Sequence, residues 1–179
     1  MRSPRPLELR MSLSLYQTSV PVFKQMLHAL KEILLKADSY ATAKKIDPNT
    51  LLQARLYPDM FPLIRQVQIA ADFARGISAR LAGIEVPVIA GNESTFADLD
   101  VLLESSLTFL ESLSTAQVDG YESRQITLRP GTPKEKKLLA HAYLTSYGLP
   151  QFFFHTTISY AILRHNGLDV GKRDYMGVY

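Results

Sequence analysis

The sequence predicts an all-α fold: a four-helix bundle with a small β-hairpin excursion between helices 3 and 4. Four long stretches carry apolar residues at helical spacing, and each stretch has an end signal. Only one short stretch alternates like a strand, and it is too small to form a sheet domain. Because 179 residues suffice for one sizeable core, we expect residues 12–179 to form a single domain after a flexible tail at 1–11.

The first two long helices are predicted over residues 20–42 and 60–82. Asp47 and Pro48 between them indicate the cap and first position of a short helix over Leu51–Leu56. Asp59 is the expected cap of the second long helix, in which several alanines would let another helix approach closely. That helix also carries Gln66 and Gln68, polar residues close to its apolar stripe.

The third helix is predicted over residues 95–114, because Thr95 and Asp98 fit a capping box. Residues 124–129 then alternate like a strand, 130–133 have turn chemistry, and 134–137 form a charged return segment that closes the hairpin. Residues 138–147 are compatible with either a short helix or irregular chain.

The fourth helix, over residues 150–166, is the central one. Pro150 suits a first helical position, and Gly167 suits the residue just past a helix end. Nearly every face between them is apolar or aromatic, which is typical of a buried helix. Gln151, His155 and Ser159 interrupt it in steps of four, so they form one polar row on one face.

His155 is the main candidate site residue. A buried neutral imidazole must satisfy both ring nitrogens by hydrogen bonds or bind a metal through one of them. One interpretation is a core histidine bonded to Gln151, Ser159 or a second-helix glutamine, Gln66 or Gln68. The other is a pocket in which His155 acts as acid, base or metal ligand while these same residues bind a substrate.

Three segments resemble an uncharacterised family placed among the DinB-like (YfiT-like) helical bundles. They are RLYPDMFPLIRQVQIAADFARGISARLAG, ESTFADL and LPQFFFHTTISYAILRHNGLDVGKRDYMG. The resemblance implies a four-helix bundle, often homodimeric, and a metal-dependent hydrolase or transferase. Its divalent ion would be held by one histidine of the second helix and an H-x-x-x-H pair on the fourth.

This sequence departs from that implied metal pattern. Gln151 and His155 stand at the four-residue spacing, and the second helix offers glutamines but no histidine. Zinc and nickel prefer several nitrogen or sulfur ligands, so one imidazole with amides is a poor site for them. We therefore expect either no cofactor or a weakly bound divalent metal at His155.

The composition and charge of the chain limit the kinds of partner that we expect. The net charge of +3 comes with no basic run, so we expect no nucleic acid to bind. No apolar run reaches the roughly 18 residues that span a bilayer, so we expect no membrane insertion. The absence of cysteine is compatible with the cytoplasm. We expect a cytoplasmic homodimer that binds a small molecule; the alternative is a non-catalytic, ligand-binding or stress-associated dimeric scaffold.

Overall fold

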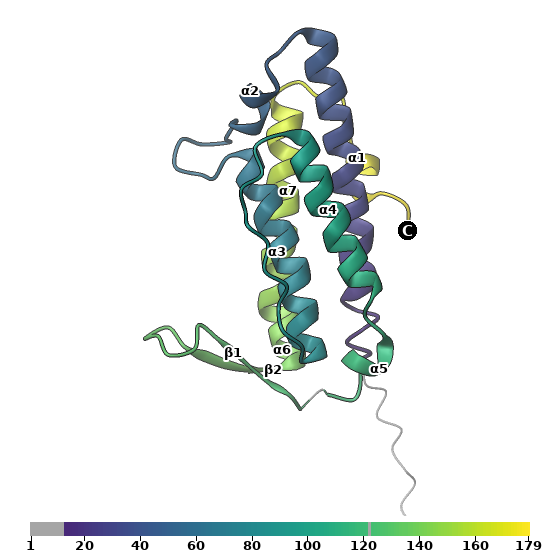
Figure 1. The fold of residues 1–179 in the computed structure, drawn as a ribbon, viewed down its shortest axis with the longest axis vertical. Coiled ribbons are helices and arrows are strands. Elements are labelled where there is room, and N and C mark those ends of the chain that lie inside the picture. Colours follow the sequence, from purple (N-terminus) through teal and green to yellow (C-terminus); the bar gives the residue numbers. More distant parts are fainter. Residues whose placement is uncertain (1–12, 122) are drawn as a thin grey trace, which may run out of the picture.

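Four long helices run side by side as the expected bundle (Figure 1). The computed structural model describes residues 13–121 and 123–179, so the predicted tail at 1–11 lies outside them. The bundle helices are α1 (Val20–Lys44), α3 (Leu63–Ala82), α4 (Phe96–Glu111) and α7 (Leu149–His165). Within the described ranges, no helix has both the length and the apolar character needed to cross a membrane.

The core is built mainly between α3 and α7 and between α1 and α4. Ala70, Ala71 and Ala74 of α3 are fully buried, which confirms that small side chains there allow a neighbouring helix to come close. Phe23 of α1 meets Phe152 of α7 edge to face, with ring centroids 4.8 Å apart. The apolar stripes therefore meet one another in a single core.

Two helix-capping motifs predicted from the sequence are confirmed. The Thr95 hydroxyl accepts a hydrogen bond from the Asp98 backbone N–H at 3.1 Å, and the Asp98 carboxylate accepts the Thr95 N–H at 2.9 Å. At the other end of the bundle, Gly167 has φ +90°. The Leu168 N–H donates to the Leu163 carbonyl at 3.1 Å across it, which closes α7 with a Schellman motif.

Two of the predicted helices have different bounds in the structure. The cap and first position of the short helix are confirmed, because the Asp47 carboxylate accepts the Asn49 N–H and α2 begins at Pro48, but it ends at Leu52 rather than Leu56. The second long helix begins at Leu63 rather than Met60. Phe61 precedes a proline, whose ring disfavours helical backbone at the residue before it, so α3 starts after Pro62.

A two-stranded antiparallel hairpin projects from one end of the bundle, after the short helix α5 (Thr115–Val118) (Figure 1). Strand β1 (Gln125–Leu128) pairs with β2 (Lys136–Leu139), and Gln125 lies opposite Leu139. The return strand begins later than predicted because the turn is longer, with left-handed backbone at Arg129 (φ +50°) and Gly131 (φ +71°).

The chain passes from the hairpin into α7 without a break in helical backbone. The helix α6 (Ala140–Tyr143) continues through the π-helical turn η1 (Leu144–Gly148) into Leu149. Pro150 is therefore near the start of α7 but is not at a free helix end. A proline lacks the N–H and crowds the carbonyl four residues earlier, and the wider turn lies where that conflict would arise. The closing helix α8 (Lys172–Met176) lies against α1, where the Gln25 amide donates to the Met176 carbonyl at 2.8 Å.

Candidate functional site

His155 is held by one directional contact between α7 and α3. Its Nδ1 lies 2.7 Å from Oε1 of Gln66. The Gln66 Nε2 donates to the Phe61 carbonyl at 3.2 Å, which fixes the amide so that its oxygen faces the imidazole. An amide oxygen only accepts hydrogen bonds, so Nδ1 carries the ring proton and Nε2 carries a lone pair in the neutral ring.

The second ring nitrogen of His155 is open. Within the described residues, Nε2 makes no hydrogen bond, and it is not one of the sealed polar atoms without a partner. The residue as a whole is 8% exposed. Burial lowers the pKa of His155, and the positive charge of Arg65 lowers it further. Because an ordinary histidine titrates near 6.5, this imidazole is neutral at pH 7.

Aromatic rings extend from His155 toward the hairpin end of the molecule. Phe73 stacks on the imidazole at 5.7 Å with 15° between the planes. Tyr147 meets Phe73 at 6.0 Å, and Tyr143 stacks on Tyr147 at 5.8 Å. These three aromatic residues were not among the predicted site residues. A signal was present, because Tyr147 and Tyr143 continue the four-residue steps backward from His155 and Gln151.

The other predicted site residues lie in different surroundings. Gln151 is half-buried, and its amide makes no hydrogen bond within the described part of the chain. Ser159 is fully buried, but its hydroxyl donates to the His155 carbonyl at 2.9 Å, on its own helix. Gln151, His155 and Ser159 therefore lie on one helix, but among them only the His155 side chain makes a hydrogen bond to α3 within the described residues.

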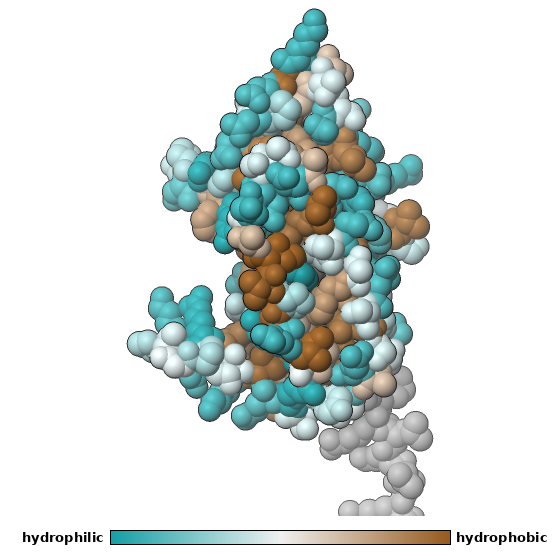
Figure 2. Space-filling model, viewed as in Figure 1, coloured by the Kyte–Doolittle hydropathy of each residue, from teal (hydrophilic) through white to brown (hydrophobic). Residues whose placement is uncertain are grey.

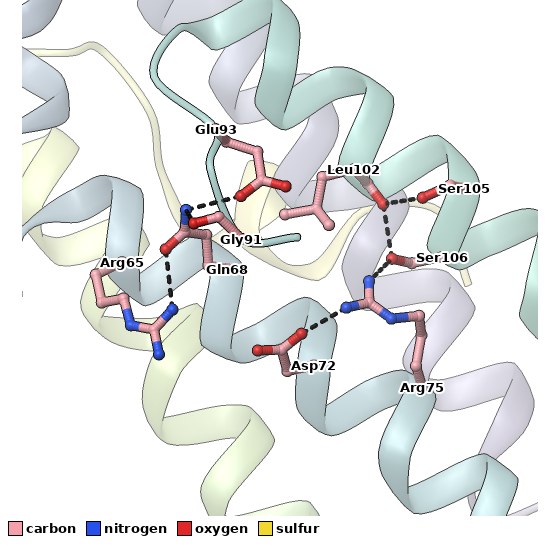
Figure 3. A network of polar contacts seen from close by, with 9 residues as sticks. All are labelled: Arg65, Gln68, Asp72, Arg75, Gly91, Glu93, Leu102, Ser105 and Ser106. Atoms are coloured by element: carbon pink, nitrogen blue, oxygen red, sulfur yellow. Dashed lines mark hydrogen bonds and ion pairs between the residues drawn. The ribbon is translucent and has the colours of Figure 1, made fainter. Parts of the chain in front are cut away.

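Gln68 points to the other side of α3 from Gln66. Figure 3 shows it between Arg65 and the segment that leads to α4. Its Nε2 donates to the Glu93 carboxylate at 2.7 Å, and its Oε1 accepts from Arg65 at 3.1 Å. Residues two apart on a helix are rotated by roughly 200°, so Gln66 and Gln68 cannot both face α7. The structure brings together His155 and Gln66, and places Gln68 outside the site.

Arg75 forms a separate polar cluster between α3 and α4. It is 2% exposed, pairs with the Asp72 carboxylate and donates to the Ser106 hydroxyl (Figure 3). Its Nε is buried and has no hydrogen-bond partner in the part of the chain that the structure describes. Because this guanidinium contacts both helices and is closed to solvent, we assign it a structural role, in which it stabilises the packing of α3 against α4.

The residues around His155 do not fit a three-histidine metal centre. No group of three or more histidine, cysteine, aspartate or glutamate side chains is placed to hold an ion within residues 13–121 and 123–179. The available donors are the Nε2 lone pair and the Gln151 amide, because the Gln66 oxygen already accepts the Nδ1 proton. One nitrogen and one amide oxygen are a weak donor set for zinc or nickel.

A cleft of about 580 Å³ lies between α3 and the hairpin, beside the aromatic rings. Figure 2 shows the hairpin standing away from the bundle with a notch above it. The charged and aromatic residues that line the cleft are Arg65, Asp72, Phe73, Arg80, Arg129, Tyr143 and Tyr147. Phe73 thus borders both the cleft and His155.

Comparison with known proteins places the chain in a family and finds related solved structures. A family model described as a domain of unknown function, DUF1993, matches residues 15–176. A solved crystal structure of a DinB family member protein from Shewanella denitrificans superposes with a TM-score of 0.87. It is 40% identical, and the match covers 92% of this chain and 93% of that one. No curated protein matches the chain.

Proposed function

The chain belongs to the DUF1993 family and has a DinB-like fold, and from this premise we propose that it is a small-molecule enzyme with His155 as its base. One observation carries the proposal: Gln66 holds the Nδ1 proton of His155, so the Nε2 lone pair is left free on a neutral ring. A general base needs this arrangement, because it must present a fixed lone pair at the working pH.

The proposed reaction is a hydrolysis or group transfer that begins with proton removal. His155 Nε2 accepts the proton of an attacking hydroxyl or thiol while that atom bonds to the substrate. The resulting imidazolium keeps its Nδ1–H bond to Gln66 and returns the Nε2 proton to the leaving group. Arg65 favours this return, because its charge disfavours the imidazolium. Gln151, four residues earlier on the same face, is the proposed substrate-binding amide.

We infer that the reaction uses no tightly bound transition metal. A weakly held divalent ion at Nε2, completed by Gln151 and water, is the remaining metal hypothesis. Metal analysis of protein purified without an affinity tag distinguishes a metal-free site from a site that holds a divalent ion. Stoichiometric zinc or nickel that His155→Gln releases would contradict the inference.

The base hypothesis has a direct spectroscopic test. Nitrogen-15 NMR of the imidazole should show Nδ1 protonated and Nε2 unprotonated at pH 7, and Gln66→Leu should weaken that preference. Any turnover found in a screen of ester, amide and thiol-transfer substrates should disappear in His155→Ala. If Nε2 carries the proton in the parent protein, or if His155→Leu retains every measured activity, the hypothesis fails.

We also propose that the protein works in the cytoplasm as a homodimer. The alternative function, a non-catalytic ligand-binding or stress-associated scaffold, would have the same dimeric state. Exposed apolar side chains support association: Val88 is 93% and Val101 68% exposed. Figure 2 shows hydrophobic residues at the surface of one face of the bundle. Light scattering should give twice the monomer mass, and a monomer at all accessible concentrations would refute the dimer.

A further inference from the structure

The cleft between α3 and the hairpin carries an excess of positive charge. Arg65 and Arg80 reach it from α3, and Arg129 reaches it from the end of β1. None of the three forms an ion pair with a carboxylate among the described residues. Asp72 is the one acidic side chain in the lining, and it already pairs with Arg75. Three guanidinium groups therefore lack a counter-ion from residues 13–121 and 123–179.

The lining also contains a connected series of aromatic rings. Tyr143, Tyr147 and Phe73 contact one another in series, and Phe73 stacks on His155. Arg80 lies 3.5 Å from the Tyr143 hydroxyl, so a cation stands at the hairpin end of this series. Stacked and edge-to-face rings favour a planar ligand, and unpaired guanidinium groups favour carboxylate or phosphate.

The backbone of the hairpin fixes one of the cations at a conformational cost. Arg129 adopts φ +50°, which is uncommon for a residue with a side chain. This conformation turns the chain directly after β1 and places Arg129 beside the cleft rather than along the strand.

We propose that this cleft binds a planar organic anion, with its ring against the edge-to-face pair of Phe73 and Tyr147 and its acid group among Arg65, Arg80 and Arg129. The volume of about 580 Å³ suits a small aromatic acid, since ligand pockets usually measure about 300–1,000 Å³. The inference names the substrate class of the proposed function, and it rests on that function only for the reaction at His155. The binding of the anion itself does not require catalysis.

Binding of naphthalene-2-carboxylate, measured by calorimetry, tests the proposal. Naphthalene-2-carboxamide keeps the ring but has no charge, and cyclohexanecarboxylate keeps the charge but is not planar. 2-Naphthyl phosphate distinguishes a preference for phosphate from one for carboxylate. We expect naphthalene-2-carboxylate and 2-naphthyl phosphate to bind. Naphthalene-2-carboxamide and cyclohexanecarboxylate should each bind at least about tenfold more weakly.

Variants locate the binding in the cleft. Arg129→Gln and Arg80→Gln should each weaken naphthalene-2-carboxylate binding about tenfold, because each removes a charge-assisted hydrogen bond. Arg129→Lys should restore part of the loss. Tyr147→Leu should weaken binding, whereas Tyr147→Phe should not. Arg164→Gln is the matched control, since this exposed arginine of α7 lies outside the cleft lining.

The two proposals can fail separately. If His155→Gln binds naphthalene-2-carboxylate like the parent while the NMR test places the proton on Nε2, the cleft inference stands and the base hypothesis fails. Equal affinity for the carboxamide, no binding at millimolar concentration, or equal losses in Arg129→Gln and Arg164→Gln would overturn the cleft inference.

Discussion

The hydrogen bond between His155 and Gln66 should have a measurable effect on stability. Replacing Gln66 by leucine leaves the buried Nδ1–H of His155 without a partner, and replacing His155 by leucine leaves the Gln66 oxygen without one. Each stranded buried group costs about 1–3 kcal/mol. For a chain of this size, a loss of about 2 kcal/mol lowers Tm by about 4–8 °C.

The double variant Gln66→Leu/His155→Leu removes both polar partners at once. It should therefore be less destabilised than the sum of the single variants, by about 1–2 kcal/mol, because neither stranded group remains. Urea unfolding of the parent, both single variants and the double variant gives the four free energies of unfolding. His155→Gln, which keeps a donor, should lie closer to the parent than His155→Leu. Additivity within about 0.5 kcal/mol would show that the contact is not energetically coupled and would refute the reasoning.

Three further predictions concern pH and helix ends. Because burial and then Arg65 lower the pKa of His155, the unfolded chain binds its proton first as pH falls. The free energy of unfolding should therefore be unaffected above about pH 7 and should decrease below about pH 6.5, and His155→Gln should lack this component in urea titrations at each pH. Thr95→Ala removes the cap of α4 and should cost about 1 kcal/mol in chemical denaturation; the exposed Thr108→Ala should change little, and equal effects would argue against capping. Gly167→Ala forces a side chain into left-handed backbone 3.0 Å from the Tyr40 hydroxyl and should cost about 1–2 kcal/mol in thermal denaturation, whereas Gly171→Ala, with open space around it, should be nearly silent.

The elements that sequence reasoning located correctly depend on local chemistry. Thr95 and Asp98 satisfy each other within one helical turn, and Gly167 adopts a backbone that its own lack of a side chain allows. The apolar stripes likewise need only the period of a helix. These signals lie within a few residues of the structures they specify.

The parts that were missed depend on how distant segments meet. Either Gln66 or Gln68 was a candidate partner of His155, and only the rotation of α3 against α7 selects Gln66. Phe73 belongs to the site because it stacks on the imidazole from α3, the helix that packs against α7. The cleft needs the hairpin to stand beside α3, and no local pattern in the sequence specifies that position.

The π-helical turn keeps two halves of a long helix in phase. In an α-helix each step of four residues overshoots a full rotation by about 40°, so a row of such steps winds away from its starting face. The turn at Leu144–Gly148 rotates less per residue and offsets part of this drift. Tyr143 and Tyr147 can thus line the cleft while His155, further along, still meets Phe73 and Gln66. A π turn uses one residue more than an α turn for nearly the same rotation, so deleting one residue at Leu144–Gly148 would restore an ordinary α-helical turn and leave the hairpin facing nearly the same way. The ring of Pro150 would then crowd the carbonyl of an α-helical turn, so we expect the deletion to cost stability rather than to reorient the hairpin.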